Sequence, residues 1–288
     1  MALDRRIIEL YDEYTHKPLA RRTFLERLSA LAGSSAAASA ALVALEPNYA
    51  HAALVPETDP RIVAERVRTK VAGVEIAGYL ARPNDDAKHP AVIVLHENRG
   101  LNAHIEDVAR RLAAAGFLAL AGDFLLPLGG TPSDADAARD LFSKLTGESV
   151  VSQAGAMLTF LRDHPNGGGK VGAVGFCWGG GMVNILAIRE PRLGAGVAFY
   201  GVAPPSEAVA RIKAPMMLHY AGLDARVNAG IPGYDAALKE AGVPHTIYVY
   251  EGVNHAFHND TSAERYNQEA ATLAFDRTVS FFKEKLAS

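Results

Sequence analysis

Cysteine is scarce in this chain of 288 residues, which contains only Cys177, and the scarcity limits its covalent and metal chemistry. A single cysteine excludes a disulfide within the chain and a zinc site built from several cysteines. No cluster of metal-ligating residues is recognisable in the sequence either, so neither a metal nor another cofactor is expected. An excess of charge is also missing, because the net charge is −3 and the pI is near 6.4. Without a basic stripe to neutralise phosphates, nucleic acid is not an expected partner.

The first fifty residues lack a long, strongly apolar run, although part of them is mildly apolar. Residues 21–25, Arg-Arg-Thr-Phe-Leu, resemble a twin-arginine export motif, and an Ala/Ser/Leu stretch follows over residues 28–45. Ala50 and Ala52 place small residues at the two positions that a signal peptidase reads. Serine and glycine keep the stretch weakly hydrophobic, so no stable membrane span is expected. Residues 1–52 are therefore predicted to be a leader that exports the protein to the periplasm. A cytoplasmic protein that retains the leader as helices remains the alternative.

From about Val55 the sequence alternates between strand-like and helix-like segments, which is typical of βαβ units. Residues 53–288 are therefore predicted to form one α/β domain with a mostly parallel, doubly wound sheet and helices on both faces. About eight strands are expected: two within 67–82, and one each near 90–96, 117–121, 170–174, 196–200, 215–220 and 245–250. Helices are expected at 102–115, at two places within 134–164, at 180–188, and around residues 208, 236 and 273.

Cys177 lies in the segment Gly-Phe-Cys-Trp-Gly, residues 175–179, between an apolar run and a helix-like stretch. This is the Gly-x-nucleophile-x-Gly pattern of the nucleophile elbow in α/β-hydrolases, with sulfur in place of the usual serine oxygen. Such a turn would point the side chain into solvent at the carboxyl edge of the sheet. The helix N-terminus beside it would favour thiolate over thiol. The alternative is a buried structural cysteine, because free cysteine is among the most buried residue types.

An acid and a base follow Cys177 in the order found in α/β-hydrolases. Asp224 comes just after the strand that ends near Tyr220, and His255 comes just after the strand that ends at Tyr250. Both side chains are therefore expected at the same edge of the sheet as the cysteine. Alternatively, Asp224 caps the following helix and His255 is a loop histidine. The other histidines have no such placement and are expected to be structural or exposed to solvent.

Glu97 and Asn98 directly follow the apolar strand that ends near Leu95. In this fold the corresponding loop supplies one backbone N–H of the oxyanion hole, which assigns the N–H groups of Asn98 and Trp178 to that role. His96 and Glu97 do not continue into His-Glu-x-x-His, because Gly100 occupies the last position. A zincin-type metal site is thereby excluded.

Together these segments resemble the dienelactone hydrolase (carboxymethylenebutenolidase) family of the α/β-hydrolase superfamily over about residues 67–285. The resemblance is carried by residues 95–102, 175–180, 222–224 and 254–257. It implies a triad of Cys177, His255 and Asp224. It also implies that Glu97 holds the thiol in the resting enzyme and helps to form the thiolate. Further residues that it implies to line the substrate pocket are Tyr200, Phe257 and His258.

Two positions depart from the family pattern. Asn259 stands where the family has an arginine that binds the substrate carboxylate, and Arg99 stands where an aromatic residue is usual. We hypothesise that Arg99 supplies the anion clamp from the opposite loop. Because the usual clamp is missing, dienelactone itself is not the expected substrate.

The sequence thus predicts a hydrolase of small carboxylic esters or lactones that forms a thioester between Cys177 and the acyl group. One alternative is a broad carboxylesterase without lactone preference. Another is a non-catalytic protein of the same fold whose Cys177 senses oxidants. The exact substrate and the oligomeric state are not determined by the sequence.

Overall fold

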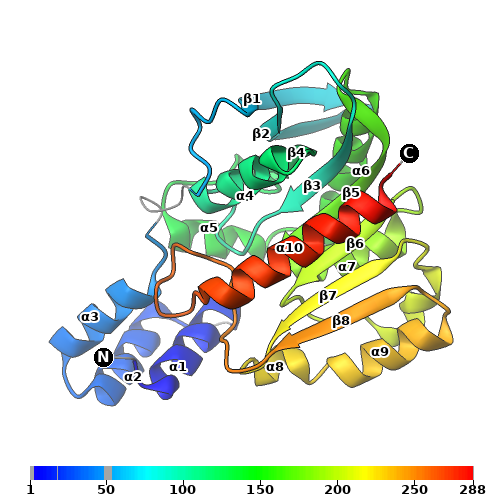
Figure 1. The fold of residues 1–288 in the computed structure, drawn as a ribbon. Coiled ribbons are helices and arrows are strands. Elements are labelled where there is room, and N and C mark those ends of the chain that lie inside the picture. The colour runs from blue at the N-terminus through cyan, green and yellow to red at the C-terminus, as the bar shows by residue number, and fades with distance from the viewer. Residues whose placement is uncertain (1–2, 18, 49–53, 288) are drawn as a thin grey trace.

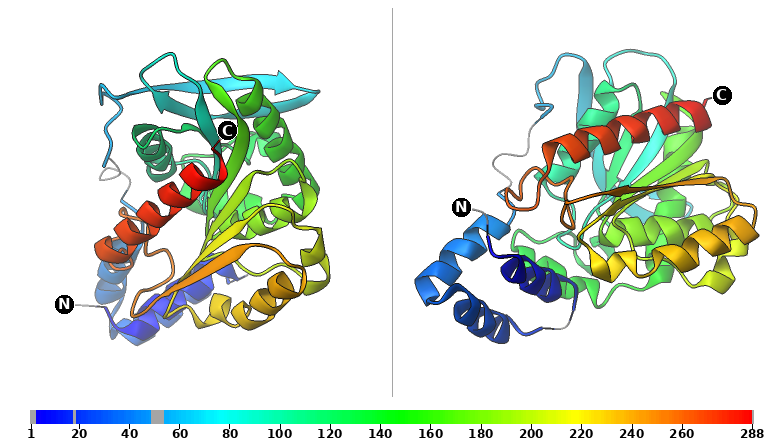
Figure 2. Two further views of the ribbon diagram at one scale, coloured as in Figure 1. Left: turned by 45° about the vertical axis from the view of Figure 1, so that its right-hand side comes forward. Right: turned by 60° about the horizontal axis from the view of Figure 1, so that its bottom comes forward.

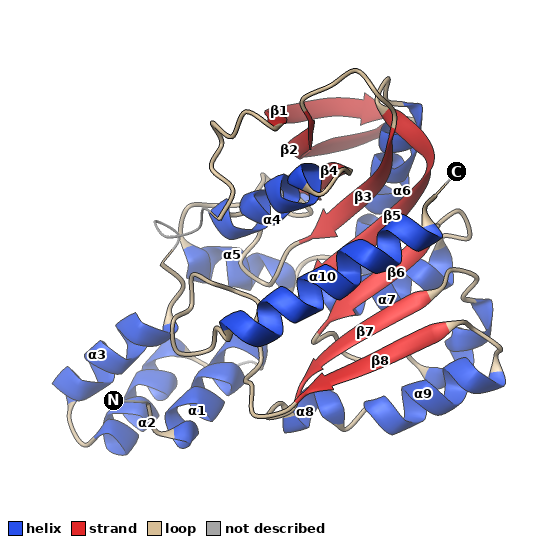
Figure 3. Ribbon diagram, viewed as in Figure 1, coloured by secondary structure: helices blue, strands red, loops and turns tan. Residues whose placement is uncertain are grey.

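Eight strands form a single sheet in the computed structural model, which describes residues 3–17, 19–48 and 54–287. The strand order is β1-β2-β4-β3-β5-β6-β7-β8 (Figures 1 and 3). The strands β3 to β8 run parallel, and β2 is antiparallel to its neighbours β1 and β4. The bounds are β1 Ile62–Val71, β2 Val74–Pro83, β3 His89–Leu95, β4 Leu118–Gly122, β5 Gly167–Phe176, β6 Ala195–Phe199, β7 Met216–Ala221 and β8 His245–Tyr250.

Helices cover both faces of the sheet, as the two views of Figure 2 show. On one face α4 (Ala103–Ala114) and α10 (Gln268–Lys285) pack through residues such as Leu112 and Phe282. On the other face α6 (Gly147–Asp163), α7 (Trp178–Arg189) and α9 (Ile231–Glu240) pack through a separate apolar cluster. The mostly parallel, doubly wound α/β-hydrolase fold predicted from the sequence is confirmed.

The main differences from the predicted elements occur where a strand carries little apolar signal. β1 begins at Ile62 instead of near residue 67, because it lies at the edge of the sheet and exposes Glu65, Arg66 and Arg68. β5 begins at Gly167 instead of near residue 170, because backbone pairing with β3 needs no apolar side chain. The shorter elements are α5 (Ala135–Phe142), α8 (Ala225–Asn228) and two 3-10 helices, Leu126–Leu128 and Ser206–Arg211.

In the part of the chain that the structure describes, three helices precede the sheet and form an N-terminal helical unit, residues 5–45: α1 (Arg5–His16), α2 (Arg21–Ala32) and α3 (Ser35–Leu45). Their buried side chains, among them Tyr11, Phe24 and Leu45, form a third apolar cluster separate from the two that cover the sheet. Gly33 ends α2 with a φ of 81°, a left-handed conformation that glycine adopts without strain. The chain turns there, so α3 packs back against α2 instead of extending it.

No single helix in the described ranges is both long and apolar enough to cross a membrane. The pair α2 and α3 passes that test only when taken together, by length and composition, and it is bent by 109°. The small residues Ala50 and Ala52 of the expected cleavage site lie outside the described residues.

The N-terminal helical unit lies at the carboxyl end of the sheet (Figure 1), and polar contacts attach it to the α/β domain there. The Asn98 Nδ2 donates to the carbonyl of Thr15 at 2.6 Å, and Arg265 lies 3.4 Å from the carboxylate of Asp12. Arg139 stacks its guanidinium over the ring of Tyr14 at 4.2 Å. These contacts place the end of α1 directly over the expected functional residues.

Candidate active site

Cys177 occupies a strained turn between β5 and α7, as the elbow pattern predicts. Its φ of 55° and ψ of −114° are unfavourable for a residue with a side chain. Close backbone approach maintains the turn, since a Cβ at Gly179 would lie 2.3 Å from the carbonyl oxygen of Leu95. In the described part of the chain, four non-glycine residues have positive φ, and three of them, Cys177, Tyr200 and Ala256, lie around this site. Strain of this kind concentrates at functional sites.

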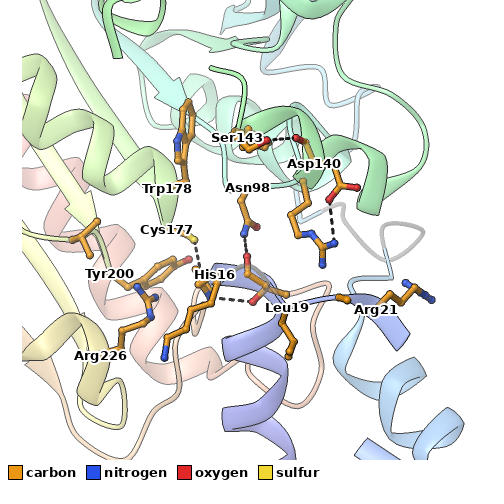
Figure 4. A pocket seen from close by; sticks show the side chains of 16 residues that line it. His16, Leu19, Arg21, Asn98, Asp140, Ser143, Cys177, Trp178, Tyr200 and Arg226 are labelled. Atoms are coloured by element: carbon orange, nitrogen blue, oxygen red, sulfur yellow. Dashed lines mark hydrogen bonds and ion pairs between the residues drawn. The ribbon is translucent and has the colours of Figure 1, made fainter. Parts of the chain in front are cut away.

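The thiol is covered, which differs from the prediction that it points into solvent. Cys177 is 6% exposed, and the imidazole of His16 at the end of α1 lies over it. The Nε2 of His16 is 3.1 Å from the Cys177 Sγ (Figure 4). Sequence reasoning placed His16 among the structural or exposed histidines, because no local pattern connects a leader residue to the elbow.

The proton positions on His16 follow from its other contacts. Its Nδ1 lies 2.8 Å from the backbone carbonyl of Asp12, which can only accept a hydrogen bond. Nδ1 therefore carries the proton, and Nε2 presents its lone pair to the sulfur. A neutral Cys177 thiol can therefore donate to His16.

Asp224 and His255 lie beside Cys177 as an acid–base pair. The Nδ1 of His255 is 2.5 Å from the Asp224 Oδ2, and both residues are buried. Asp224 also caps the short helix α8 by accepting from the N–H of Val227 at 3.1 Å, so the capping alternative and the pairing with His255 both hold. The Nε2 of His255 is buried without a hydrogen-bond partner and lies within 4.8 Å of the Cys177 Sγ.

The charges of this group shift several pKa values. Burial acts to lower the pKa of His255, but the charges of Cys177 and Asp224 and the hydrogen bond to Asp224 raise it to about 10. Burial acts to raise the pKa of Asp224, but the hydrogen bond and charge of His255 hold it below its usual value. Burial, with repulsion from His255, lowers the pKa of His16 well below its usual value. His16 is therefore neutral near pH 7, whereas His255 readily holds a proton.

Glu97 is buried next to this group and is held by two donors. The Asn259 Nδ2 donates to one carboxylate oxygen at 2.7 Å, and the Tyr200 hydroxyl donates to the other at 3.4 Å. Asn259 was noted in the sequence only as a missing arginine, and in the structure its side chain donates the hydrogen bond that holds Glu97. The contact between thiol and Glu97 that the family resemblance implies is replaced in this structure by the contact between thiol and His16.

Asn98 and Trp178 flank Cys177, where the oxyanion hole was predicted. Trp178 is the first residue of α7, so its backbone N–H lies at the helix N-terminus, where N–H groups lack partners within the helix. Its indole ring stacks on His96 with ring centroids 5.3 Å apart. The side chain of Asn98 is occupied by the carbonyl of Thr15, which ties this loop to α1.

A cavity of about 870 Å³ opens beside Cys177, between the N-terminal helical unit and the α/β domain (Figure 4). Its walls include Trp178 and Tyr200 from the domain and His16 from α1. Tyr200 thus lines the pocket, as expected. The walls also carry four cationic side chains but only one carboxylate, that of Asp140. The four cations are Lys17, Arg21, Arg139 and Arg226.

Three predicted substrate-binding residues do not line this cavity. Arg99 is 7% exposed and forms an ion pair with Asp136 at 3.0 Å, so the structure does not support the hypothesis that it is a free anion clamp. Phe257 and His258 are buried in the core, where His258 packs on Phe176 with ring centroids 4.9 Å apart. Phe257 and His258 directly follow the loop of His255 in sequence, and their packing in the core supports that loop.

Comparison with known proteins assigns the chain to a protein family. The family model described as "Dienelactone hydrolase family" matches residues 76–286. The chain belongs to the dienelactone hydrolase family. It is 30% identical to a protein of Methylorubrum extorquens provisionally named a carboxymethylenebutenolidase, with 93% of this chain and 96% of that protein covered. A protein of Synechocystis with the same provisional name is 32% identical, with 74% of this chain and 93% of that protein covered.

A solved structure of a provisionally assigned dienelactone hydrolase from Klebsiella pneumoniae has a TM-score of 0.71 and 29% identity. It covers 77% of this chain and 99% of its own, which leaves 23% of this chain without a counterpart. The match to the Methylorubrum relative leaves out only 7% of this chain, less than the length of the N-terminal helical unit. The Methylorubrum match therefore includes part of the N-terminal helical unit.

Proposed function

We propose that this member of a hydrolase family cleaves small carboxylic esters or lactones, with Cys177 as nucleophile, His255 as base and Asp224 as the orienting acid. The observation that supports this most directly is the convergence of three groups from separate loops: the Sγ of Cys177, the unpartnered Nε2 of His255 and the carboxylate on its Nδ1. Nucleophile, base and orienting acid in this order make up a covalent hydrolysis site.

The reaction begins when an ester enters the cavity and the Cys177 proton passes to the Nε2 of His255. The thiolate attacks the carbonyl carbon, and the N–H groups of Asn98 and Trp178 stabilise the oxyanion, each contributing roughly 3 kcal/mol. His255 then protonates the leaving alcohol as the thioester forms. Water, deprotonated by His255, releases the acid and restores the thiol. An amine leaves less readily than a thiolate, so esters and lactones are favoured over amides.

Glu97 places a second carboxylate next to the residues that exchange protons in this reaction. It is held in place by Asn259 and Tyr200. As a second carboxylate close to the nucleophile, it favours transfer of the thiol proton to His255 and stabilises the resulting imidazolium. Its role in the proposal is therefore to promote thiolate formation once the substrate has displaced His16.

The cavity walls favour an acidic substrate. Lys17 and Arg226 line a space that reaches the sulfur, whereas Arg139 beside them is paired with Asp140 at 3.1 Å. A carboxylate on the acyl or alcohol part would be attracted there. In this proposal these side chains take over the role that the sequence had suggested for Arg99.

The decisive experiment is a hydrolysis screen of the purified full chain and its Cys177→Ala variant on matched esters and lactones with anionic and neutral acyl groups. Wild type is expected to prefer the anionic members, and Cys177→Ala is expected to lose at least about 1000-fold in kcat/KM on all of them. Turnover by Cys177→Ala close to that of wild type would remove the cysteine from the mechanism. Equal rates on lactones and open esters would favour a broad carboxylesterase.

A thiol sensor fits the same site less well. Cys177 is 6% exposed and already hydrogen-bonded, whereas oxidant-sensing cysteines are accessible. A complete acid–base pair beside it would also have no use in a sensor.

A further inference from the structure

Three potential metal ligands from distant parts of the chain converge on the cavity. The Nε2 of His16, the Sγ of Cys177 and the Nε2 of His255 all lie within 4.8 Å of one another. Tetrahedral zinc with one sulfur and two imidazole ligands requires ligand atoms roughly 3.3–3.6 Å apart. The observed separation of 3.1 Å between His16 and Cys177 is close to this range, so small side-chain movements would complete the geometry.

Both imidazoles already have the orientation that a metal requires. His16 donates its Nδ1 proton to the backbone carbonyl of Asp12, and His255 donates its Nδ1 proton to the carboxylate of Asp224. In its neutral form each ring directs the lone pair of its Nε2 toward the sulfur, so a metal must first displace any proton that the His255 Nε2 holds. Histidines that bind metals almost always donate their other ring N–H to a carboxylate or a carbonyl in this way.

One of the three groups has no partner within hydrogen-bond distance in the described part of the chain. The Nε2 of His255 makes no hydrogen bond within the described residues, and His255 is only 2% exposed. A buried polar atom without a partner is costly, and a bound ion would satisfy it. This observation is independent of the spacing of the three ligand atoms.

We propose that His16, Cys177 and His255 form a binding site for Zn²⁺, with the fourth coordination position open to the cavity for water or a small anion. A thiolate and two imidazoles suit zinc, whereas Mg²⁺ and Ca²⁺ prefer oxygen ligands. The sequence offered no recognisable ligand cluster because His16 comes from α1 and the other two ligands follow β5 and β8. Only the docked N-terminal helical unit completes the set.

Zinc at this site would inhibit the proposed hydrolysis reversibly. The ion would occupy the thiolate and the base together, displacing the thiol proton and any proton on the His255 Nε2. Binding would therefore release protons and weaken as the pH falls. It would also hold α1 on the domain, because His16 is the only ligand that the N-terminal helical unit provides.

The test is a metal titration of the full chain in the absence of substrate, after removal of metals with a chelator. One equivalent of Co²⁺ should give the intense visible bands of a tetrahedral ion together with sulfur-to-cobalt charge transfer, and Zn²⁺ should bleach both. Cys177→Ser should abolish the charge-transfer band. His16→Gln should lower the affinity by more than the roughly 10–100-fold typical for loss of an outer-shell partner. The control His89→Gln, altered at a histidine paired with Asp85 at the start of β3, should bind as wild type does.

X-ray absorption of the zinc-loaded wild type provides a second measurement that does not depend on how the variants fold. It should show one sulfur, two imidazole nitrogens and one lighter ligand. Fewer than two imidazoles, Co²⁺ bound without charge transfer, or equal affinity in His16→Gln and His89→Gln would overturn the proposal. Because no substrate is present, failure of this site is distinct from failure of the proposed hydrolysis.

Discussion

The N-terminal helical unit and the α/β domain differ in the size of their apolar cores, and polar contacts join the two parts to each other. The domain buries two large apolar clusters, one on each side of its sheet, whereas the unit buries a small cluster of its own. The two parts meet through contacts such as Asn98 with Thr15 and Arg265 with Asp12. The domain therefore fixes the positions of Cys177, Asp224 and His255, and the docked unit covers Cys177 through His16. Polar contacts of this kind depend on pH and salt far more than apolar packing does.

The largest expected effect is on catalysis by the domain. Asp224→Asn keeps the shape of the side chain but removes the charge that fixes the tautomer of His255, so kcat should fall by about 10⁴-fold. Ester hydrolysis and thermal unfolding should be measured together. A fall in activity without a comparable fall in Tm would assign the effect to chemistry. Activity within tenfold of wild type would contradict the role of Asp224.

The next effect tests how rigidly the domain holds the elbow. Gly179→Ala would place a Cβ 2.3 Å from the Leu95 carbonyl oxygen, and the backbone must shift to relieve the clash. We expect a loss of about 3 kcal/mol in the free energy of unfolding. The matched control is Gly233→Ala in α9, where nothing lies within 4 Å of the new Cβ. There the change should stabilise by about 0.5–1 kcal/mol. Urea unfolding of both variants measures the difference.

A smaller effect is expected from pH, which changes the docking of the N-terminal helical unit and the stability of the domain over different pH ranges. The pKa of His16 is lowered in the docked state, so docking is stable above the ordinary histidine pKa and weakens as the pH falls below about 6.5. The pKa of His255 is raised to about 10, so its contribution is complete below about 6.5 and is lost as the pH rises through 10. Trp178, the single tryptophan, lines the cavity and should report undocking by its fluorescence. In His16→Gln the acid transition should disappear, and an unchanged transition would assign it to another group.

The smallest expected effect on the fold of the α/β domain is that of removing the leader, residues 1–52. This step also decides which form of the protein is present in the cell. We propose that residues 21–25 direct export, so a cleaved protein in the periplasm would lack His16 and the contacts of α1. Mass spectrometry of the protein from periplasmic and cytoplasmic fractions measures this directly. A periplasmic product that begins after residue 52 would mean that the cavity is open in the mature protein. A full-length cytoplasmic product would favour retention of the covered site.

Much of the domain could be predicted from the sequence because its signals are local. Cys177, Asp224 and His255 each follow an apolar strand, and the carboxyl ends of parallel strands meet at one edge. His16 could not be found this way, since its position depends on how the N-terminal helical unit docks. The ion pair between Arg99 and Asp136 could not be predicted, because Asp136 lies on α5 and no spacing rule connects the two. Asn259 was noted as a departure, but its bond to Glu97 is visible only in three dimensions.

The exposed strand β1 has a consequence for how copies of this molecule meet in solution. Its outer edge has no neighbour in the sheet, and its side chains include Glu65, Arg66, Arg68 and Lys70. An approaching strand would have to strip water from these groups before it could pair with the backbone. Charged edge strands of this kind protect sheet proteins against edge-to-edge aggregation. These charged residues, which weaken the hydrophobic pattern of β1 in the sequence, thus help to keep the sheet at eight strands.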